Sequence, residues 1–176
     1  MPRVSKAPEQ IKLVFISLLE EKPIEKINVS DITKKAKISR TTFYNHFENM
    51  ESLIEFTLES SLEEITKILN KNLLFKVPVL TEMLTYILQK RYIFDAWVKY
   101  FPNIDVIITD YIKSMLRNSD IVDIDLQLRQ GYEVSEKFAF ELYVMTIKTI
   151  ILNWVASGYE ESPQEIAEII HKTVRI

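Results

Sequence analysis

The sequence predicts an all-α protein with a small N-terminal helical head and a larger C-terminal helical body. Apolar residues recur at spacings of three and four along most of the chain, which is the period of amphipathic helices. Glycine, a strong helix breaker, occurs only at positions 131 and 158. The 176 residues are 47% hydrophobic, which is ample for a packed core. We expect the head to span residues 1–50 and the body to span residues 51–176.

The first helix of the head should begin near Pro8, because proline is favourable in a first turn, and end before Pro23. Its apolar residues follow the helical spacing i, i+3, i+4, i+7 and i+8: Ile11, Val14, Phe15, Leu18 and Leu19. This face predicts a helix that packs across the next two, with Phe15 meeting Phe43 and Phe47.

Two short helical patterns follow in residues 28–47 with almost no linker between them. Asn28 is a favourable N-cap, and Asp31 stands three residues later, where its carboxylate can reach free first-turn amides. Ser39 is a second N-cap, and Phe43 and Phe47 then share a buried side one turn apart. Two capped helices joined so closely predict a helix-turn-helix.

The second of these helices carries a polar outer face formed by Arg40, Thr41, Tyr44 and Asn45. Spacings of one, four and five residues keep these side chains on one side of a helix. A guanidinium, a phenol and two small hydrogen-bonding groups suit phosphates and base edges. A polar outer face is also typical of ordinary surface helices, so the face alone leaves both interpretations open.

The motif resembles the helix-turn-helix of TetR-family transcriptional repressors. The resemblance covers roughly residues 8–55 and is carried by Ile-Ser-Arg-Thr-Thr-Phe-Tyr-Asn-His-Phe at 38–47, by Val-Ser-Asp-Ile at 29–32 and by Asn-Met-Glu-Ser-Leu at 49–53. Three residues depart from the family pattern: Thr33 replaces an alanine, Lys37 the usual turn glycine, and Met50 a lysine that often reaches a phosphate. Lys37 must therefore avoid a positive φ or tolerate one at a cost of about 1 kcal/mol.

The resemblance implies a homodimer that places this second helix in successive major grooves of a pseudo-palindromic double-stranded DNA operator, with half-sites about 34–36 Å apart or a multiple of that distance. Arg40 is the expected base reader because its fork matches guanine, with Thr41 and Asn45 as secondary readers. Family positions Thr42, Tyr44 and His46 should hold phosphates. The complete predicted DNA-binding set is Ser30, Ser39, Arg40, Thr41, Thr42, Tyr44, Asn45 and His46.

The charge distribution favours the head as the part that meets an anionic partner, although the net charge of the chain is -3. Residues 1–50 carry nine Lys or Arg against six Asp or Glu, a balance of +3, and the remaining residues carry thirteen against nineteen, a balance of -6. Four cations stand at the motif itself: Lys34, Lys35, Lys37 and Arg40. They could neutralise phosphates and release counterions, or form an ordinary solvated charge run.

The body should begin with a long connecting helix that Asn49 caps and that extends to about Leu74. Residues 118–133 read as a loop or a short irregular helix. Residues 135–157 form the most apolar helical pattern, whose charges argue against a membrane span. Gly158 should end that helix, and Ser162 and Glu165 should cap the last one.

The last two helices are expected to form the dimer face, and an intramolecular core pair is the alternative. The candidate interface residues are Trp154, Ile166 and Ile170. The resemblance further implies a small-molecule effector in the body that releases the operator. Trp97, Tyr100 and Tyr111 could line its pocket, although the same aromatic residues also fill cores.

Other classes of function find little support in the sequence. There is no cysteine and no glycine-rich phosphate loop, and the two histidines have no evident catalytic partner, so we expect no enzyme activity, cofactor or metal. The first residues lack the apolar core of a signal peptide, which predicts a cytoplasmic protein. The alternative function is a helical dimeric interaction protein or co-regulator whose head no longer binds DNA.

Overall fold

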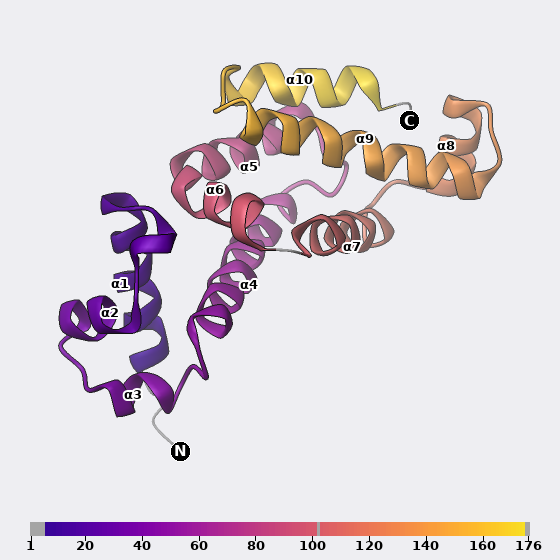
Figure 1. Ribbon diagram of the computed structural model, residues 1–176. Coiled ribbons are helices and arrows are strands. Elements are labelled where there is room, and N and C mark those ends of the chain that lie inside the picture. Colours follow the sequence, from indigo (N-terminus) through magenta and orange to yellow (C-terminus); the bar gives the residue numbers. More distant parts are fainter. Residues whose placement is uncertain (1–5, 102, 175–176) are drawn as a thin grey trace. The chain divides into compact units, whose positions relative to one another are not determined.

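The computed structural model describes residues 6–101 and 103–174, except for the side chain of Tyr100 (Figure 1). In this part of the chain the regular elements are all helical, which confirms the all-α prediction. They are α1 (Ala7–Glu21), the 3-10 turn η1 (Ile24–Lys26), α2 (Val29–Ala36), α3 (Arg40–Tyr44), α4 (Met50–Leu69), α5 (Val77–Gln89), α6 (Arg91–Tyr100), α7 (Ile104–Arg117), α8 (Ile124–Tyr132), α9 (Glu136–Ala156) and α10 (Pro163–Thr173).

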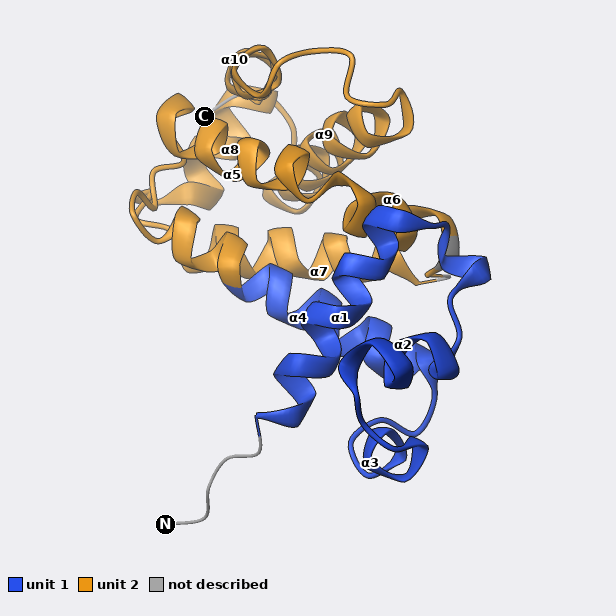
Figure 2. Ribbon diagram, turned by 90° about the vertical axis from the view of Figure 1, so that its left-hand side faces the viewer, with its two compact units in different colours: residues 1–63 blue, residues 64–176 orange. Residues whose placement is uncertain are grey.

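The chain forms two compact units, Met1–Glu63 and Glu64–Ile176 (Figure 2). The division falls inside α4, later than the end of the head expected at residue 50. The core of the first unit explains the difference, because Leu53 of α4 is fully buried in it. Ile54 and Phe56 pack against the same core, so the start of α4 belongs to the head.

The core of the first unit joins α1, α2, α3 and the start of α4. It consists of Ile11, Phe15, Leu18, Ile27, Val29, Ile32, Phe43, Phe47 and Leu53. Phe15, Phe43 and Phe47 belong to one cluster, as predicted, and the rings of the last two lie 5.7 Å apart between centroids. This core cluster removes the apolar sides of α1, α2 and α3 from water. No one of these helices could bury its own apolar side without the others.

Side-chain caps set the starts of the helices in this unit. The Asn28 Oδ1 atom accepts a hydrogen bond from the Asp31 amide (3.1 Å), and the Asp31 carboxylate accepts one from the Asn28 amide (3.0 Å). The Ser39 hydroxyl accepts a hydrogen bond from the Thr42 amide at 3.0 Å. These contacts confirm both predicted caps and satisfy first-turn amides that a helix leaves without partners.

The connecting helix α4 ends at Leu69, earlier than the predicted end near Leu74. Two local features beyond this end keep the following residues from continuing the helix. The Asn72 side chain accepts a hydrogen bond from the Leu74 amide, an interaction that competes with the helical backbone. Phe75 then adopts a positive φ of 49°, which a right-handed helix cannot contain.

The second unit is built around α9, which contacts α6, α7, α8 and α10, while α10 also packs along α5 (Figure 1). Its best-defined core cluster contains Leu116, Leu128, Ala139, Phe140, Tyr143 and Val144. Trp154 is 2% exposed, and its indole N–H donates to the Glu161 carbonyl at 2.9 Å. The predicted Ser162–Glu165 capping box is present, and Gly158 has a φ of 81°, as a helix stop requires.

Residues 118–133 contain the regular nine-residue helix α8, where the sequence predicted a loop or an irregular helix. Left-handed residues stand on both sides of it, Asp123 with a φ of 49° and Glu133 with a φ of 55°. α8 packs against α9 and buries Leu128 completely. Packing against a long neighbour therefore stabilises a helix that its own sequence specifies only weakly.

Of the described helices, α9 alone is long and apolar enough to cross a membrane by length and composition, with a mean hydropathy of 1.4. In the sequence, the charged residues of this helix argue against a membrane span, but they are too few to exclude one by composition. One helix of this kind is weak evidence for a membrane, because core helices of soluble proteins have the same properties. Only 33% of the apolar window is buried within the chain, so much of this helix is free to meet another surface.

Candidate nucleic-acid interface

The turn between α2 and α3 is closed by a Schellman motif centred on Lys37. The Ile38 amide donates to the Thr33 carbonyl (3.0 Å), and the Lys37 amide donates to the Lys34 carbonyl (3.3 Å). This pattern requires a left-handed residue at Lys37, which has a φ of 54° and a ψ of 44°. The turn thus tolerates the positive φ instead of avoiding it, at a cost of about 1 kcal/mol relative to glycine.

The recognition element is short, since α3 contains only five residues and the sequence pattern had suggested that the helix continues to Phe47. Asn45 nevertheless keeps a right-handed helical backbone, and its amide donates to the Thr41 carbonyl at 2.9 Å. Arg40, Thr41, Tyr44 and Asn45 are all exposed. The polar face predicted from their spacing is therefore available to a partner.

Tyr44 links this face to the core beneath it. Its side chain is 51% exposed, while its ring meets the buried Phe43 ring edge-on, with 5.4 Å between centroids. An edge-to-face contact restricts the orientation of the exposed ring. The contact with Phe43 therefore holds the Tyr44 ring in one orientation on the surface of the head.

The other predicted DNA-binding residues lie in α2 and in or directly beside α3. Ser30 near the start of α2 is exposed, as are Ser39 and His46 at the two ends of α3. Thr42 is half-buried, and its hydroxyl lies 2.9 Å from the Ser39 hydroxyl. Ser39 and Thr42 therefore help to cap α3. A phosphate bound by either hydroxyl group would have to use a group that already takes part in the cap.

Ion pairs divide the cations in and near the motif into two groups. Lys22 pairs with Asp31 at 2.8 Å, and Lys35 pairs with Glu21 at 2.5 Å. The hydrogen bond from Lys22, together with the Asn28 amide, holds the pKa of Asp31 below its ordinary value. Lys35 is thus partly neutralised, although the sequence placed it with the other cations of the cluster.

The second group consists of Lys34, Lys37 and Arg40, which we call the unpaired cations. Among residues 6–101 and 103–174, no acidic side chain forms an ion pair with any of the three, and all are exposed. They stand at the end of α2, in the turn and at the start of α3. Lys34 still interacts with the Asp31 carboxylate at longer range and helps to lower its pKa, so Lys37 and Arg40 carry the least compensated charge of the three. Exposed positive charges beside a polar helix suit a nucleic-acid phosphate backbone.

Two family models match the chain. That of bacterial regulatory proteins of the tetR family covers residues 16–55, and that of a transcriptional regulator C-terminal region covers residues 77–175, more than half of the sequence. The chain belongs to the TetR family. Members of this family are DNA-binding transcriptional regulators, and α2 and α3 both lie within the segment that matches the family's N-terminal model.

Sequence relatives match this TetR-family chain in a limited segment. An uncharacterised HTH-type transcriptional regulator of Bacillus subtilis, YxbF, is 39% identical over 64 residues, 36% of this chain and 17% of that protein. The dhaKLM operon transcriptional activator DhaS of Lactococcus lactis is 40% identical over 55 residues, 31% of this chain and 29% of that protein. The matched segments thus span less than a third of either relative.

Solved structures match the TetR-family fold over nearly the whole chain. The dihydroxyacetone kinase operon activator DhaS has a TM-score of 0.69 at 20% identity and covers 96% of this chain and 93% of its own. The fatty acid degradation regulator FadR of Bacillus halodurans has a TM-score of 0.64 at 16% identity, covering 98% and 96%. Thermus thermophilus FadR, a repressor solved with lauroyl-CoA, has a TM-score of 0.55 at 18% identity, covering 95% and 92%.

The aromatic residues predicted to line an effector pocket have other contacts. Trp97 is 2% exposed and packs edge-on against Phe94, with 4.8 Å between ring centroids. The Tyr111 hydroxyl shares a hydrogen bond of 2.8 Å with the Thr66 hydroxyl, and burial raises the pKa of this phenol. The side chain of Tyr100 lies outside the described part of the structure. Trp97 thus fills the core, and Tyr111 links α7 to the end of α4.

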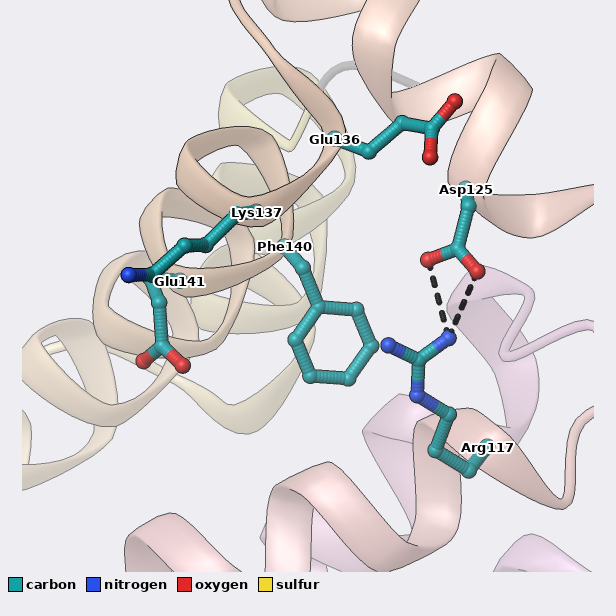
Figure 3. A pocket seen from close by; sticks show the side chains of 6 residues that line it. All are labelled: Arg117, Asp125, Glu136, Lys137, Phe140 and Glu141. Atoms are coloured by element: carbon teal, nitrogen blue, oxygen red, sulfur yellow. Dashed lines mark hydrogen bonds and ion pairs between the residues drawn. The ribbon is translucent and has the colours of Figure 1, made fainter.

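A surface pocket of about 370 Å³ lies elsewhere in the second unit and has a mostly charged lining (Figure 3). Its residues are Arg117, Asp125, Glu136, Lys137, Phe140 and Glu141. The Arg117 guanidinium donates to both Asp125 carboxylate oxygens at 2.8 Å and lies 3.9 Å from the centre of the Phe140 ring. Arg117, Asp125 and Phe140 therefore interact with one another and link α7, α8 and α9.

The residues predicted at the dimer interface are buried within the chain itself. Trp154, Ile166 and Ile170 are each at most 3% exposed, so they have almost no surface left with which to contact a partner subunit. Other large apolar residues of the same two helices, which the sequence analysis did not single out, are exposed. These are Phe138, Leu142 and Met145 of α9 and Ile169 of α10, which we call the apolar row. The spacings of four and three residues within α9 were the signal that could have found them.

Proposed function

We propose that two copies of this chain bind a pseudo-palindromic DNA operator, with α3 of each copy in successive major grooves, and repress transcription until a small-molecule effector releases them. The observation that carries the proposal is the exposed polar face of α3. This helix is capped by Ser39, and the unpaired cations lie beside it in the chain. The proposal includes a cytoplasmic location, where a bacterial operator would be accessible.

Arg40 is the proposed base reader, because its planar fork can donate to both acceptors of a guanine. Its exposed position at the first residue of α3 suits that role, since the N-terminal residues of a recognition helix meet the base edges. Thr41 and Asn45 lie on the same face and are secondary readers. Ser30, Ser39, Thr42, Tyr44 and His46 are proposed to hold phosphates.

Substitution of Arg40 tests the reading of the operator. Arg40→Ala should lower specific binding by about 1–3 kcal/mol and relax one base position, while Tyr44→Phe should weaken all sequences similarly. Arg40→Lys keeps the charge but loses the fork, so it should also relax that position. Binding-site selection on the three variants and the parent measures this. If Arg40→Ala returns the parent's motif, Arg40 does not read bases.

The homodimer is proposed to form through the apolar row. Exposed Phe138, Leu142 and Met145 leave one side of α9 uncovered within the chain, and Ile169 is exposed on α10, which contacts α9. A second copy would remove this surface from water in a two-fold interface. The same contact explains why the most apolar helix of the chain is only 33% buried in its apolar window.

A charge placed in this row should separate the two copies. Phe138→Asp should shift the protein from dimer to monomer in light scattering after size exclusion, because an unpaired carboxylate would be buried in the interface. Leu13 provides a matched control, since Leu13 and Phe138 are each 63% exposed but Leu13 lies on α1. Leu13→Asp should stay dimeric. A dimer that withstands both Phe138→Asp and Met145→Asp would contradict the proposed face.

The sign of regulation has a second candidate, because the name of the relative DhaS describes an activator. Deletion of the gene distinguishes the two. Expression from the operator-bearing promoter rises on deletion if the protein represses and falls if it activates. Support for an effector comes from Thermus thermophilus FadR, which was solved with lauroyl-CoA. Release of the operator by a small molecule in a gel-shift assay would establish effector control.

The alternative interaction protein makes a different prediction in the same assay. A functional head should bind its operator specifically, and affinity should fall steeply between two salt concentrations, because bound phosphates release counterions. A dimer that binds no DNA above the nonspecific level at low salt would instead favour a protein partner.

A further inference from the structure

The left-handed residue of the turn carries a positive charge. Five described non-glycine residues have a positive φ: Lys37, Phe75, Asp123, Glu133 and Tyr159. Lys37 is the only cation among these five and the only one in the first unit. Because the Schellman motif sets its backbone conformation, the position specifies a left-handed residue but not an ammonium group. Glycine or asparagine would adopt that conformation with less strain.

The Lys37 ammonium group forms no ion pair within the described head. Lys22 and Lys35, the cations that bridge α1 and α2, have carboxylate partners in Asp31 and Glu21. Lys37 is exposed, and among the described residues it forms no ion pair. The side chain thus adds positive charge to the head without joining two of its elements.

The position of Lys37 also separates it from the base-reading face. It precedes Ser39, the cap of α3, and it is not part of the helical register that presents Arg40, Thr41 and Tyr44. Met50, at the start of α4, is an apolar residue packed against the core of the head and supplies no charge there. Among the described residues, the cations of the motif without an ion pair are therefore Lys37 in the turn, Lys34 three residues before it and Arg40 three residues after it.

We propose that Lys37 contacts a backbone phosphate at the edge of the groove that α3 enters, and that it sets DNA affinity without influencing sequence choice. Lysine suits this role because it is a flexible point charge with three donors, whereas base recognition favours the planar fork of arginine. The inference rests on the proposed operator binding and adds to it a phosphate-positioning residue in the turn.

Two substitutions separate the charge from the backbone strain. Lys37→Asn removes the charge and keeps a residue that tolerates a positive φ, so its melting temperature should equal or exceed that of the parent. Its plot of log affinity against log salt should be flatter by about 0.9 for each subunit. Affinity should fall by a similar factor for operator and unrelated DNA, and binding-site selection should return the parent's motif. Lys37→Arg should keep the parent's salt slope.

Lys35→Asn is the matched control, because Lys35 lies two residues away but is paired with Glu21. Its slope should change much less than that of Lys37→Asn. An unchanged slope in Lys37→Asn, an equal change in both variants, or a changed motif would overturn the proposal. The parent protein separates this failure from that of the proposed function: if it binds no DNA, both fail, whereas specific parental binding with an unaffected Lys37→Asn slope overturns only the phosphate contact.

Discussion

Replacement of Phe43 by alanine should unfold much of the head. Phe43 is fully buried, and its ring meets those of Tyr44 at 5.4 Å and Phe47 at 5.7 Å. Truncation of a buried phenylalanine typically costs about 3–5 kcal/mol. Whole domains are stable by only about 5–15 kcal/mol, so this single change removes a large part of what holds α1, α2 and α3 together. Specific DNA binding should be lost with it.

The distribution of tryptophan makes this effect easy to assign. Trp97 and Trp154, the two tryptophans of the chain, both lie in the second unit. Hydrogen exchange of head peptides should therefore rise strongly in Phe43→Ala, while native tryptophan fluorescence remains close to that of the parent. Urea unfolding followed by far-UV circular dichroism should show reduced stability of the helical signal from the head.

Tyr44→Ala is the control, because it removes an aromatic ring from the same helix at a side chain that is 51% exposed. It should cost clearly less than Phe43→Ala, because about half of its side chain is already in contact with water, while the ring pair itself contributes only about 0.5–1.5 kcal/mol beyond the buried area. If the two variants lose equal stability, or if head peptides in Phe43→Ala exchange as slowly as in the parent, Phe43 is not the centre of this core.

Two further predictions concern single polar contacts. The hydrogen bond from Lys22 and the amide of Asn28 hold the pKa of Asp31 below its ordinary value of 3.8, so this contribution to stability is complete above that value and is lost as pH falls through the folded-state pKa. Asp31→Asn should therefore flatten the fall of the urea midpoint below about pH 4; an unchanged acid limb would refute this. Tyr159→Phe removes a 2.8 Å hydrogen bond to Asp95 and should lower the stability of the second unit by about 1 kcal/mol in tryptophan-monitored unfolding. An unchanged midpoint would show that the bond contributes nothing.

The helix starts and the recognition motif were accessible from the sequence because they depend on residues close together in the chain. Asn28 and Asp31 form their capping box across three residues, as do Ser162 and Glu165. Such contacts need no distant partner, so local pattern predicts them well. The face of α3 is equally local, since helical spacing alone brings Arg40, Thr41, Tyr44 and Asn45 to one side.

The role of each cation and each apolar residue depended on distant neighbours. Lys35 looked equivalent to Lys37 in sequence, but α1 brings Glu21 to Lys35 and leaves Lys37 unpaired. Trp154 and Phe138 belong to the same apolar helix, yet one is buried and the other is 63% exposed. Helical period reveals that a side is apolar, but it does not reveal which neighbour covers that side.

The sequence by itself therefore determined the helical class, the capped helix-turn-helix and the residues that face outward from α3, because each follows from spacing within one or two turns. Tertiary structure alone decided where the head ends within α4, which cations remain unpaired and which apolar residues of α9 and α10 stay exposed. These depend on contacts between elements far apart in the chain, where burial and ion pairing are settled by packing.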